Sequence, residues 1–298
     1  QGSTTIGRLK VAVTIIDING TELTARNLKA GKLAEEINNR SDLTSITVTG
    51  GTLNKADWEA IKKSNATLQI IDLEGATYEG DDKDNWVYKI NRVMDGRLET
   101  VKLPQGITAL GESAFYGCIG LTTVTLPETL TSIENDAFRS CTVLTSIDLP
   151  DKVTSIGNDA FSNCYALTSI TLPDGVTSIG NNAFYDCKAL KSIDLPDGLE
   201  SIGNNAFYDC KALTSIELPD GVTSIGEHAF ESCTSLTSID LPDGLTSIGY
   251  RAFYDCNALT SITLPAGVTS IVTFAFYSCS DLTTVTCLAT TPPTMGSN

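Results

Sequence analysis

The clearest pattern in the sequence is a set of apolar positions that recurs every 23 residues over two thirds of the chain, with one full copy at residues 190–212. A constant period of this length predicts a stacked solenoid, because one unit cannot bury its apolar face alone and each neighbour completes the core. Phenylalanine and cysteine mark the period most plainly, at Phe115, Phe138, Phe161, Phe184, Phe207, Phe230, Phe253 and Phe276 and at Cys118, Cys141, Cys164, Cys187, Cys210, Cys233, Cys256 and Cys279.

Within one copy, Leu121, Val124 and Leu126 follow the alternation of a short strand, which places Thr123 and Thr125 on the solvent-facing side. Pro127 ends that strand, since a residue without an N–H can stand only where the ladder needs no donor. Equivalent strands of successive copies are therefore expected to stack into a parallel ladder.

The remainder of each copy turns the chain back to the start of the next strand. Pro-Asp-Gly at residues 196–198 is a turn signal, and Gly180 and its equivalents are expected to relieve a tight corner. Leu130 and Ile133 supply two further core contacts. The Asn-Ala-Phe-Tyr-Asp-Cys segment that follows predicts at most one helical turn.

The pattern divides the chain into four parts. The first lacks the repeat and predicts a cap, because the first turn of a solenoid must hide its apolar end from water. The second carries the same apolar signature at irregular spacings. In order, we predict an N-terminal cap over residues 1–42, atypical repeats over 43–97, eight 23-residue repeats over 98–281 and a partial ninth repeat over 282–298.

Regular elements are also predicted before the repeats begin. Residues 10–17 alternate as a strand and are followed by a turn signal at Asn19-Gly20. Residues 30–38 have the spacing of a short amphipathic helix. Residues 53–64 predict a second helix, for which Asn54 can serve as the N-terminal cap.

The charge of the chain excludes one class of partner. A net charge of −16 and a pI near 4.4 repel nucleic acid and anionic lipid, so no phosphate-backbone partner is expected. No uninterrupted apolar run approaches the roughly 18–20 residues that cross a bilayer. The acidic residues 79–85 predict a solvated loop rather than a cation site, because their spacing does not fit a calcium loop.

The nine cysteines do not suggest a disulfide framework, because eight of them occupy the same position in successive repeats. Adjacent thiols could come within bonding range, but disulfide geometry would have to recur at every step. We therefore predict a column of small buried thiols beside the phenylalanine column, and reject a zinc site. Cys287 takes the place of Leu264 in the preceding repeat and is expected to substitute for it in the core.

The sequence offers no candidate for a catalytic acid, base or nucleophile. His228 stands where other repeats have Asn182 or Asn205, which favours a surface substitution over a general base. The serines lack a partner that would activate them. Acidic side chains such as Asp194 and Glu217 recur on an open sheet rather than in a cleft. We therefore predict no enzyme activity and no cofactor.

Two surfaces could carry function. The outward strand positions form a hydroxyl-rich face with a central acidic patch, which is either a plain solvated sheet or a broad face that binds basic proteins. Its candidate residues are Ser146, Asp148, Ser192, Asp194, Ser215, Glu217, Ser238 and Asp240. The equivalent outward positions of other repeats carry only Ser and Thr: Thr123/Thr125, Ser169/Thr171, Ser261/Thr263 and Thr284/Thr286.

The second surface is a row of tyrosines that directly follow the phenylalanines, at Tyr116, Tyr185, Tyr208, Tyr254 and Tyr277. Neighbouring residues on a turn point in different directions, so each tyrosine is at least partly exposed if the phenylalanine is buried. Such a row can bind proteins or stack on sugars, or it can simply pack its rings along the flank of the solenoid. We favour the packing interpretation.

The consensus Leu-x-x-Ile-x-Leu-Pro-x-x-Val/Leu-x-x-Ile-Gly-x-x-Ala-Phe-x-x-Cys resembles the BspA-like, or treponemal-type, leucine-rich repeat. The resemblance is close over residues 98–298 and loose over 43–97. It implies an α/β fold, a right-handed leucine-rich-repeat solenoid or horseshoe, with the parallel ladder on its inner face and short helical turns and loops outside. It also implies an exported bacterial surface protein with a role in adhesion, and no catalytic residues.

Together, these observations predict a non-catalytic, extracellular or cell-surface protein, monomeric, that binds a host or microbial protein. A carbohydrate-binding or nutrient-capture accessory protein of the envelope is one alternative, and a structural spacer is another. Residues 295–298 resemble the segment that precedes Ala-Phe in other repeats, which predicts that the repeat continues in a longer chain.

Overall fold

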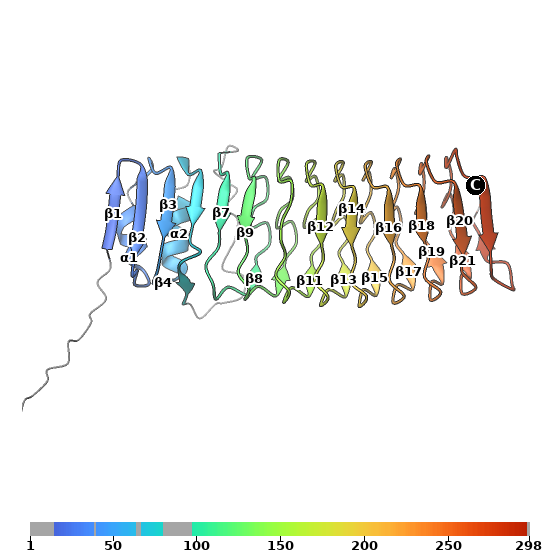
Figure 1. Ribbon diagram of the computed structural model, residues 1–298, viewed down its shortest axis with the longest axis horizontal. Coiled ribbons are helices and arrows are strands. Elements are labelled where there is room, and N and C mark those ends of the chain that lie inside the picture. Colours follow the sequence, from blue (N-terminus) through green and yellow to red (C-terminus); the bar gives the residue numbers. More distant parts are fainter. Residues whose placement is uncertain (1–14, 39, 64–66, 80–96, 297–298) are drawn as a thin grey trace, which may run out of the picture.

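The computed structural model describes residues 15–38, 40–63, 67–79 and 97–296. Its turns stack in one row along the long axis of the molecule, as the 23-residue period predicts (Figure 1). Each regular turn has three sides: an inner face formed by Leu-x-x-Ile-x-Leu, a second face formed by Thr-Ser-Ile, and a turn flank formed by Ala-Phe-x-x-Cys.

The inner face begins as one sheet of six strands. The antiparallel hairpin at its start is followed by parallel strands in register, so that Ile46, Ile71, Val101 and Val124 stand in one column. These strands are β1 (Ile15–Asn19), β2 (Glu22–Arg26), β3 (Ser45–Val48), β5 (Ile70–Asp72), β7 (Thr100–Lys102) and β9 (Thr123–Thr125).

Beyond β9 the inner ladder is broken into pairs, where the sequence predicted a continuous ladder. Residues 145–148 form no strand, and the later strands pair only two by two. The pairs are β12 (Ser169–Thr171) with β14 (Ser192–Asp194), β16 (Ser215–Glu217) with β18 (Ser238–Asp240), and β20 (Ser261–Leu264) with β22 (Thr284–Cys287).

The continuous ladder of the repeats lies on the second face, for which the sequence pattern predicts only core contacts. Nine two-residue strands pair there in parallel, with Ile133, Ile156 and Ile179 in one column. They are β8 (Ala109–Leu110), β10 (Ser132–Ile133), β11 (Ser155–Ile156), β13 (Ser178–Ile179), β15 (Ser201–Ile202), β17 (Ser224–Ile225), β19 (Ser247–Ile248), β21 (Ser270–Ile271) and β23 (Thr294–Met295). A separate pair, β4 (Thr52–Leu53) and β6 (Thr77–Tyr78), lies in the atypical turns.

The turn flank is held between repeats by backbone hydrogen bonds. The N–H of each buried Phe from Phe115 to Phe253 donates to the carbonyl of the Ala in the next turn, at 2.7–2.9 Å. Two positions per turn adopt the left-handed conformation, as at Asn182 (φ 56°) and Asp186 (φ 60°). Asn and Asp tolerate this conformation better than other side chains, which explains their recurrence in these columns.

The core is one continuous column of apolar side chains. Phe rings of successive turns stack with centroids 5.2–5.5 Å apart and are fully buried from Phe115 to Phe253. Phe276, in the last full turn, is only partly buried. The leucines, isoleucines, alanines and phenylalanines therefore recur because they fill this column, as the repeat predicts.

The predicted column of buried thiols is confirmed. Cysteines from Cys118 to Cys256 are free and buried. Each repeat thiol from Cys141 to Cys279 donates to the carbonyl of the Phe in the turn before its own, at 3.2 Å for Cys164 Sγ and Phe138 O. The prediction that Cys287 substitutes in the core is wrong in part. It pairs in register with Leu264, but it is exposed because no further described turn stacks on it.

The N-terminal part has the predicted hairpin turn at Asn19-Gly20, with Gly20 at a φ of 61°. β1 is the edge strand of the inner sheet. It pairs with β2, whose other side pairs with β3, so β1 covers the free edge of the first parallel strand. Of the strand predicted over residues 10–17, the part before Ile15 lies outside the described residues, as do residues 80–85 of the predicted acidic loop.

Both predicted helices are present as α1 (Lys32–Ile37) and α2 (Lys55–Lys63), beside the first strands (Figure 1). Asn54 caps α2 as predicted, because its Oδ1 accepts the N–H groups of Ala56 (3.0 Å) and Asp57 (3.2 Å). No sequence pattern marks Asp57, which lies in the first turn of α2. Its buried carboxylate accepts the N–H groups of Gly31 (2.7 Å) and Ala34 (2.9 Å), so it joins the start of α2 to α1.

The corner glycines predict a sharp effect on stability. A Cβ at Gly203 would lie 2.7 Å from the backbone nitrogen of Asn181, whereas a Cβ at Gly198 would meet only Asp174 O at 3.6 Å. We expect Gly203→Ala to lower the free energy of unfolding by about 1–3 kcal/mol. Gly198→Ala should be neutral or slightly stabilising, because it restricts the unfolded chain. Thermal unfolding followed by circular dichroism distinguishes the two, and equal melting temperatures would contradict the close-packing explanation.

The buried thiols predict a loss of stability in alkali. Burial raises the pKa of Cys118 and of Cys164 to about 12, above the value of about 8.5 expected in the unfolded chain. The contribution to stability is complete below pH 8.5 and falls as pH rises toward 12, because only the unfolded chain then releases protons. Removing one such group in Cys164→Ala should make the decline of the unfolding free energy shallower by up to about 1.4 kcal/mol per pH unit. Urea titrations between pH 8 and 10.5 measure this slope, and identical slopes would refute the assignment.

Candidate functional site

The predicted inner-face residues are all exposed, and six of the eight stand in strands. Ser192 and Asp194 lie in β14, Ser215 and Glu217 in β16, and Ser238 and Asp240 in β18, each with a buried isoleucine between them. Ser146 and Asp148 alternate in the same way around buried Ile147 but lie in the segment without a strand. The structure therefore brings these polar side chains onto one face.

Two hollows of about 200 Å³ lie on the inner face where the ladder is broken. The first is lined by Asp148 and Asp151 together with residues of β12. The second lies between β14 and β16 and is lined by Asp194, Asp197 and Glu217. These hollows could not be anticipated from the sequence, since every repeat there has the same strand signature.

Carboxylates on this face are largely unneutralised. Glu217 and Asp240 are register partners in the β16–β18 pair, which places two like charges directly opposite each other, an unfavourable arrangement on a sheet. Asp194 Oδ2 accepts a hydrogen bond from Thr171 Oγ1 (3.3 Å). Among the described residues, no Lys or Arg forms an ion pair with these three carboxylates.

A second row of carboxylates borders the inner face, where an aspartate follows the proline in each of five successive repeats. The Pro-Asp-Gly turn signal covers four of these aspartates, and their regular recurrence in the sequence is the signal that identifies the row. All are exposed: Asp151, Asp174, Asp197, Asp220 and Asp243.

The predicted tyrosine row lies on the turn flank. Tyr116 (40 % exposed) and Tyr277 (52 % exposed) are the most accessible, while Tyr185, Tyr208 and Tyr254 are half-buried. Rings of adjacent turns stack, at 4.8 Å between Tyr185 and Tyr208 and at 5.4 Å between Tyr254 and Tyr277. Packing along the flank therefore accounts for much of the row.

Charged side chains accompany the central tyrosines. Burial is the main cause that raises the pKa of Tyr185, and the nearby carboxylate of Asp186 raises it further. Burial and a hydrogen bond with Asp209 raise the pKa of Asp186, although Lys188 Nζ lies 3.2 Å from its carboxylate. These groups form a polar border around the stacked rings.

An asparagine ladder runs beside this row. Asn181 Oδ1 accepts the backbone N–H of Asn204 (2.8 Å), and Asn204 Oδ1 accepts that of Glu227 (2.9 Å). Asn135 and Asn158 make the same bond to the following turn. The ladder ends at Glu227, because the side chains in this column are then Glu227, Tyr250 and Thr273.

Where the ladder ends, aromatic and charged side chains gather into one cluster, which we call the flank cluster and which the sequence analysis did not find. The Arg251 guanidinium lies 4.7 Å from the ring centroid of Tyr254 and 5.2 Å from that of Tyr250. We assigned His228 no role, yet its Nδ1 contacts the buried carboxylate of Glu231. The cluster consists of His228, Glu231, Tyr250, Arg251, Tyr254, Phe274 and Tyr277.

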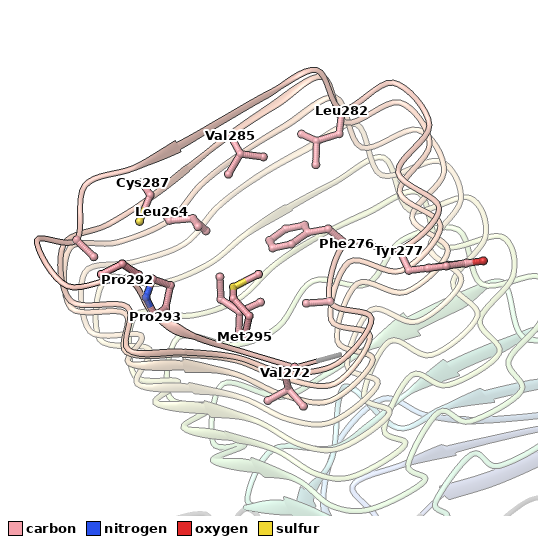
Figure 2. Close-up of a pocket in the computed structure, with 14 residues that line it drawn as sticks. Leu264, Val272, Phe276, Tyr277, Leu282, Val285, Cys287, Pro292, Pro293 and Met295 are labelled. Atoms are coloured by element: carbon pink, nitrogen blue, oxygen red, sulfur yellow. The ribbon is translucent and has the colours of Figure 1, made fainter. Parts of the chain in front are cut away.

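The last described turn leaves an apolar cavity of about 560 Å³ open at the end of the stack. Phe276 points into it and Tyr277 points out toward the flank (Figure 2). Val285, Cys287 and Met295 line the cavity as well, and none of its lining residues is charged. The cavity exposes core positions that are covered by a neighbouring turn elsewhere in the stack.

The described residues hold no group of three or more His, Cys, Asp or Glu side chains placed to bind a metal ion. In the same part of the chain, neither helix has the length and apolar character needed to span a bilayer.

Comparison with known proteins identifies the repeat. The pattern of the BspA type leucine rich repeat region, in six copies, matches residues 94–214 and 200–293. No curated protein sequence matches the chain.

Solved structures of bacterial repeat proteins are similar to this chain. A leucine rich cell surface protein of Faecalibacterium prausnitzii is 31 % identical over 84 % of this chain and 74 % of that one, with a TM-score of 0.48. The leucine rich repeat protein of T. pallidum is 35 % identical over 51 % of this chain and 73 % of that one, with a TM-score of 0.49. A leucine-rich repeat protein of Bacteroides ovatus is 21 % identical over 93 % and 88 %, with a TM-score of 0.37.

The asparagine ladder predicts a graded effect of substitutions in one column. Asn181→Ala removes the acceptor of the Asn204 N–H and should lower the free energy of unfolding by about 1 kcal/mol. Glu227→Ala is the matched control, because its side chain occupies the same column and accepts no such bond among the described residues. Urea unfolding of both variants provides the test. A control that loses as much stability as Asn181→Ala would contradict the role of the ladder.

Proposed function

The chain belongs to the BspA type leucine-rich repeat family, and on this basis we propose that it is a non-catalytic scaffold whose inner face binds a basic protein. The proposal extends to an exported, monomeric protein at the bacterial cell surface that adheres to host or microbial proteins. The family match and the name of the F. prausnitzii protein, a cell surface protein, support this location.

The observation that carries the proposal is the set of unneutralised carboxylates around the second hollow of the inner face. Asp194, Asp197 and Glu217 line this hollow, and Asp240 stands opposite Glu217 on the next strand. Like charges in this arrangement weaken the isolated protein. A partner that places Lys or Arg side chains among them would remove that repulsion on binding.

Electrostatics also gives such a surface a kinetic advantage. The whole chain carries −16, and the exposed Asp row adds to the field of the strand carboxylates on the same face. Complementary fields steer a basic partner toward the surface and raise the association rate, an effect that salt screens. The contact itself would be a broad one, since the described strands of this face from β9 to β22 are polar on their outward side and carry no aromatic side chain.

The absence of catalysis in the proposal rests on the chemistry of the groups present. The thiols from Cys118 to Cys256 are buried. Burial raises the pKa of Cys118 to about 12 and that of the partly buried Cys279 to about 11, so these two groups are not thiolates at neutral pH. The inner-face carboxylates lie on an open sheet that does not enclose a substrate. Buried, protonated thiols also suit an oxidising extracellular environment, because they are protected from disulfide exchange.

The test is a binding assay in which this protein is immobilised and a panel of basic, neutral and acidic extracellular-matrix proteins is passed over it. We expect at least one basic member to bind, with an affinity that falls as salt rises. The double variant Asp194→Asn/Glu217→Gln should weaken that binding by about tenfold or more, mainly through the association rate.

The matched control is Glu200→Gln/Glu227→Gln, which changes the net charge equally at two exposed carboxylates outside the inner-face strands. This control should bind like the unmodified protein. An equal loss in both double variants would mean that only net charge matters, and failure of every basic protein to bind would overturn the proposal.

A further inference from the structure

The flank cluster departs from the repeat at positions where the fold favours other residues. One left-handed column has Asp136, Asp159, Asn182 and Asn205 in four successive turns, and then His228, Arg251 and Phe274 in the next three. The φ angles stay between 52° and 61° in these three, so the backbone has not changed to suit the new side chains. The change of residue type is therefore not a response to the fold.

These replacements make the local structure less favourable. A bulky residue in the left-handed region is strained, and Phe274 has a φ of 61°. The hydrogen bonds of the asparagine ladder also end in the same turns, because Glu227, Tyr250 and Thr273 replace the asparagines. Strain and lost hydrogen bonds concentrated in one place point to a function of that place rather than to stability.

Charged groups are also held in the cluster under unfavourable conditions. The Glu231 side chain is only 7 % exposed, between His228 Nδ1 on one side and Arg251 Nη1 at 3.9 Å on the other. Arg251 Nε is buried and has no hydrogen-bond partner among the described residues. The long distance and the unpaired donor leave hydrogen-bonding capacity that the protein itself does not use.

Aromatic rings frame this polar centre. Tyr254 stacks on Tyr277, and Phe274 meets Tyr277 edge to face at 5.5 Å. Tyr277 is half exposed and points outward from the stack (Figure 2). The cluster thus offers ring surface next to hydroxyl, guanidinium and carboxylate groups.

The dimensions of the cluster favour a small ligand. Its three turns are separated by 5.4 Å and 5.3 Å, as measured between the stacked rings of Phe230, Phe253 and Phe276. A typical protein interface takes about 20–30 residues from each partner, many more than the cluster contains. The positive charge of Arg251 and the negative charge of Glu231 cancel, so the cluster favours a ligand without net charge.

We propose that the flank cluster is a glycan-binding site that takes a neutral oligosaccharide, independently of the protein-binding inner face. Sugar rings are apolar on one face and carry hydroxyl groups at their edges. Tyr277 and Phe274 supply ring surface for the apolar face. The partly exposed Arg251 guanidinium and the outward-pointing Tyr277 hydroxyl (Figure 2) supply donors and an acceptor for the hydroxyl groups. The buried Glu231 carboxylate lies between His228 and Arg251 beneath these groups.

The test is a printed array of neutral plant, microbial and host oligosaccharides, followed by calorimetric titration with the oligosaccharide that gives the strongest signal. We expect the unmodified protein to bind one structural class. Tyr277→Ala should weaken that binding by about tenfold or more. Phe274→Asn, which restores the residue type of the earlier turns, should weaken it similarly while the melting temperature stays equal or rises.

Two controls separate this site from other effects. Tyr116→Ala removes an exposed tyrosine of the same row in the first regular repeat and should leave glycan affinity unchanged. The inner-face variant Asp194→Asn/Glu217→Gln should also leave it unchanged. The proposal is overturned if no neutral glycan binds, if Phe274→Asn and Tyr277→Ala bind as well as the unmodified protein, or if these two variants lose affinity for a protein partner alone.

Discussion

The spacing between successive turns, 5.2–5.5 Å from one buried Phe ring to the next, is the constraint on which the rest of the structure depends. Three sets of interactions hold it: the stacked rings, the hydrogen bonds from each Phe N–H to the next Ala carbonyl, and the nine-stranded ladder of the second face. Gly180 and Gly203 are required because backbone from the neighbouring turn lies within 2.6–2.7 Å of where a Cβ would stand.

This constraint separates the columns of the repeat into two kinds. Columns that face the core or the close backbone contacts admit only a few residue types, which is why Leu, Ile, Ala, Phe, Cys and Gly recur. Columns that face solvent are free of that requirement, so their residue types can follow function. The acidic inner-face positions and the flank cluster both belong to the second kind, and in both the residue choice makes the isolated protein less stable than the fold would allow.

Much of the fold could be predicted from the sequence because each column repeats its physical requirement eight times. The buried thiols, the cap at Asn54 and the turn at Asn19-Gly20 were predictable from local chemistry alone. The flank cluster was not, because its members are far apart in sequence and belong to columns that differ from turn to turn. The role of Asp57 could not be predicted for a similar reason: its partners Gly31 and Ala34 belong to another element.

The sequence by itself determined the period, the direction in which each side chain faces and the identity of the core. Only the tertiary structure decided that the continuous ladder lies on the second face and that the inner ladder breaks into pairs, with hollows beside Asp148 and between Asp194 and Glu217. The physical reason is that near-identical repeats have the same local sequence preferences, whereas strand pairing depends on how the backbones of neighbouring turns pack against each other. The exposure of Cys287 was decided in the same way, since a core position is buried only when a neighbouring turn covers it.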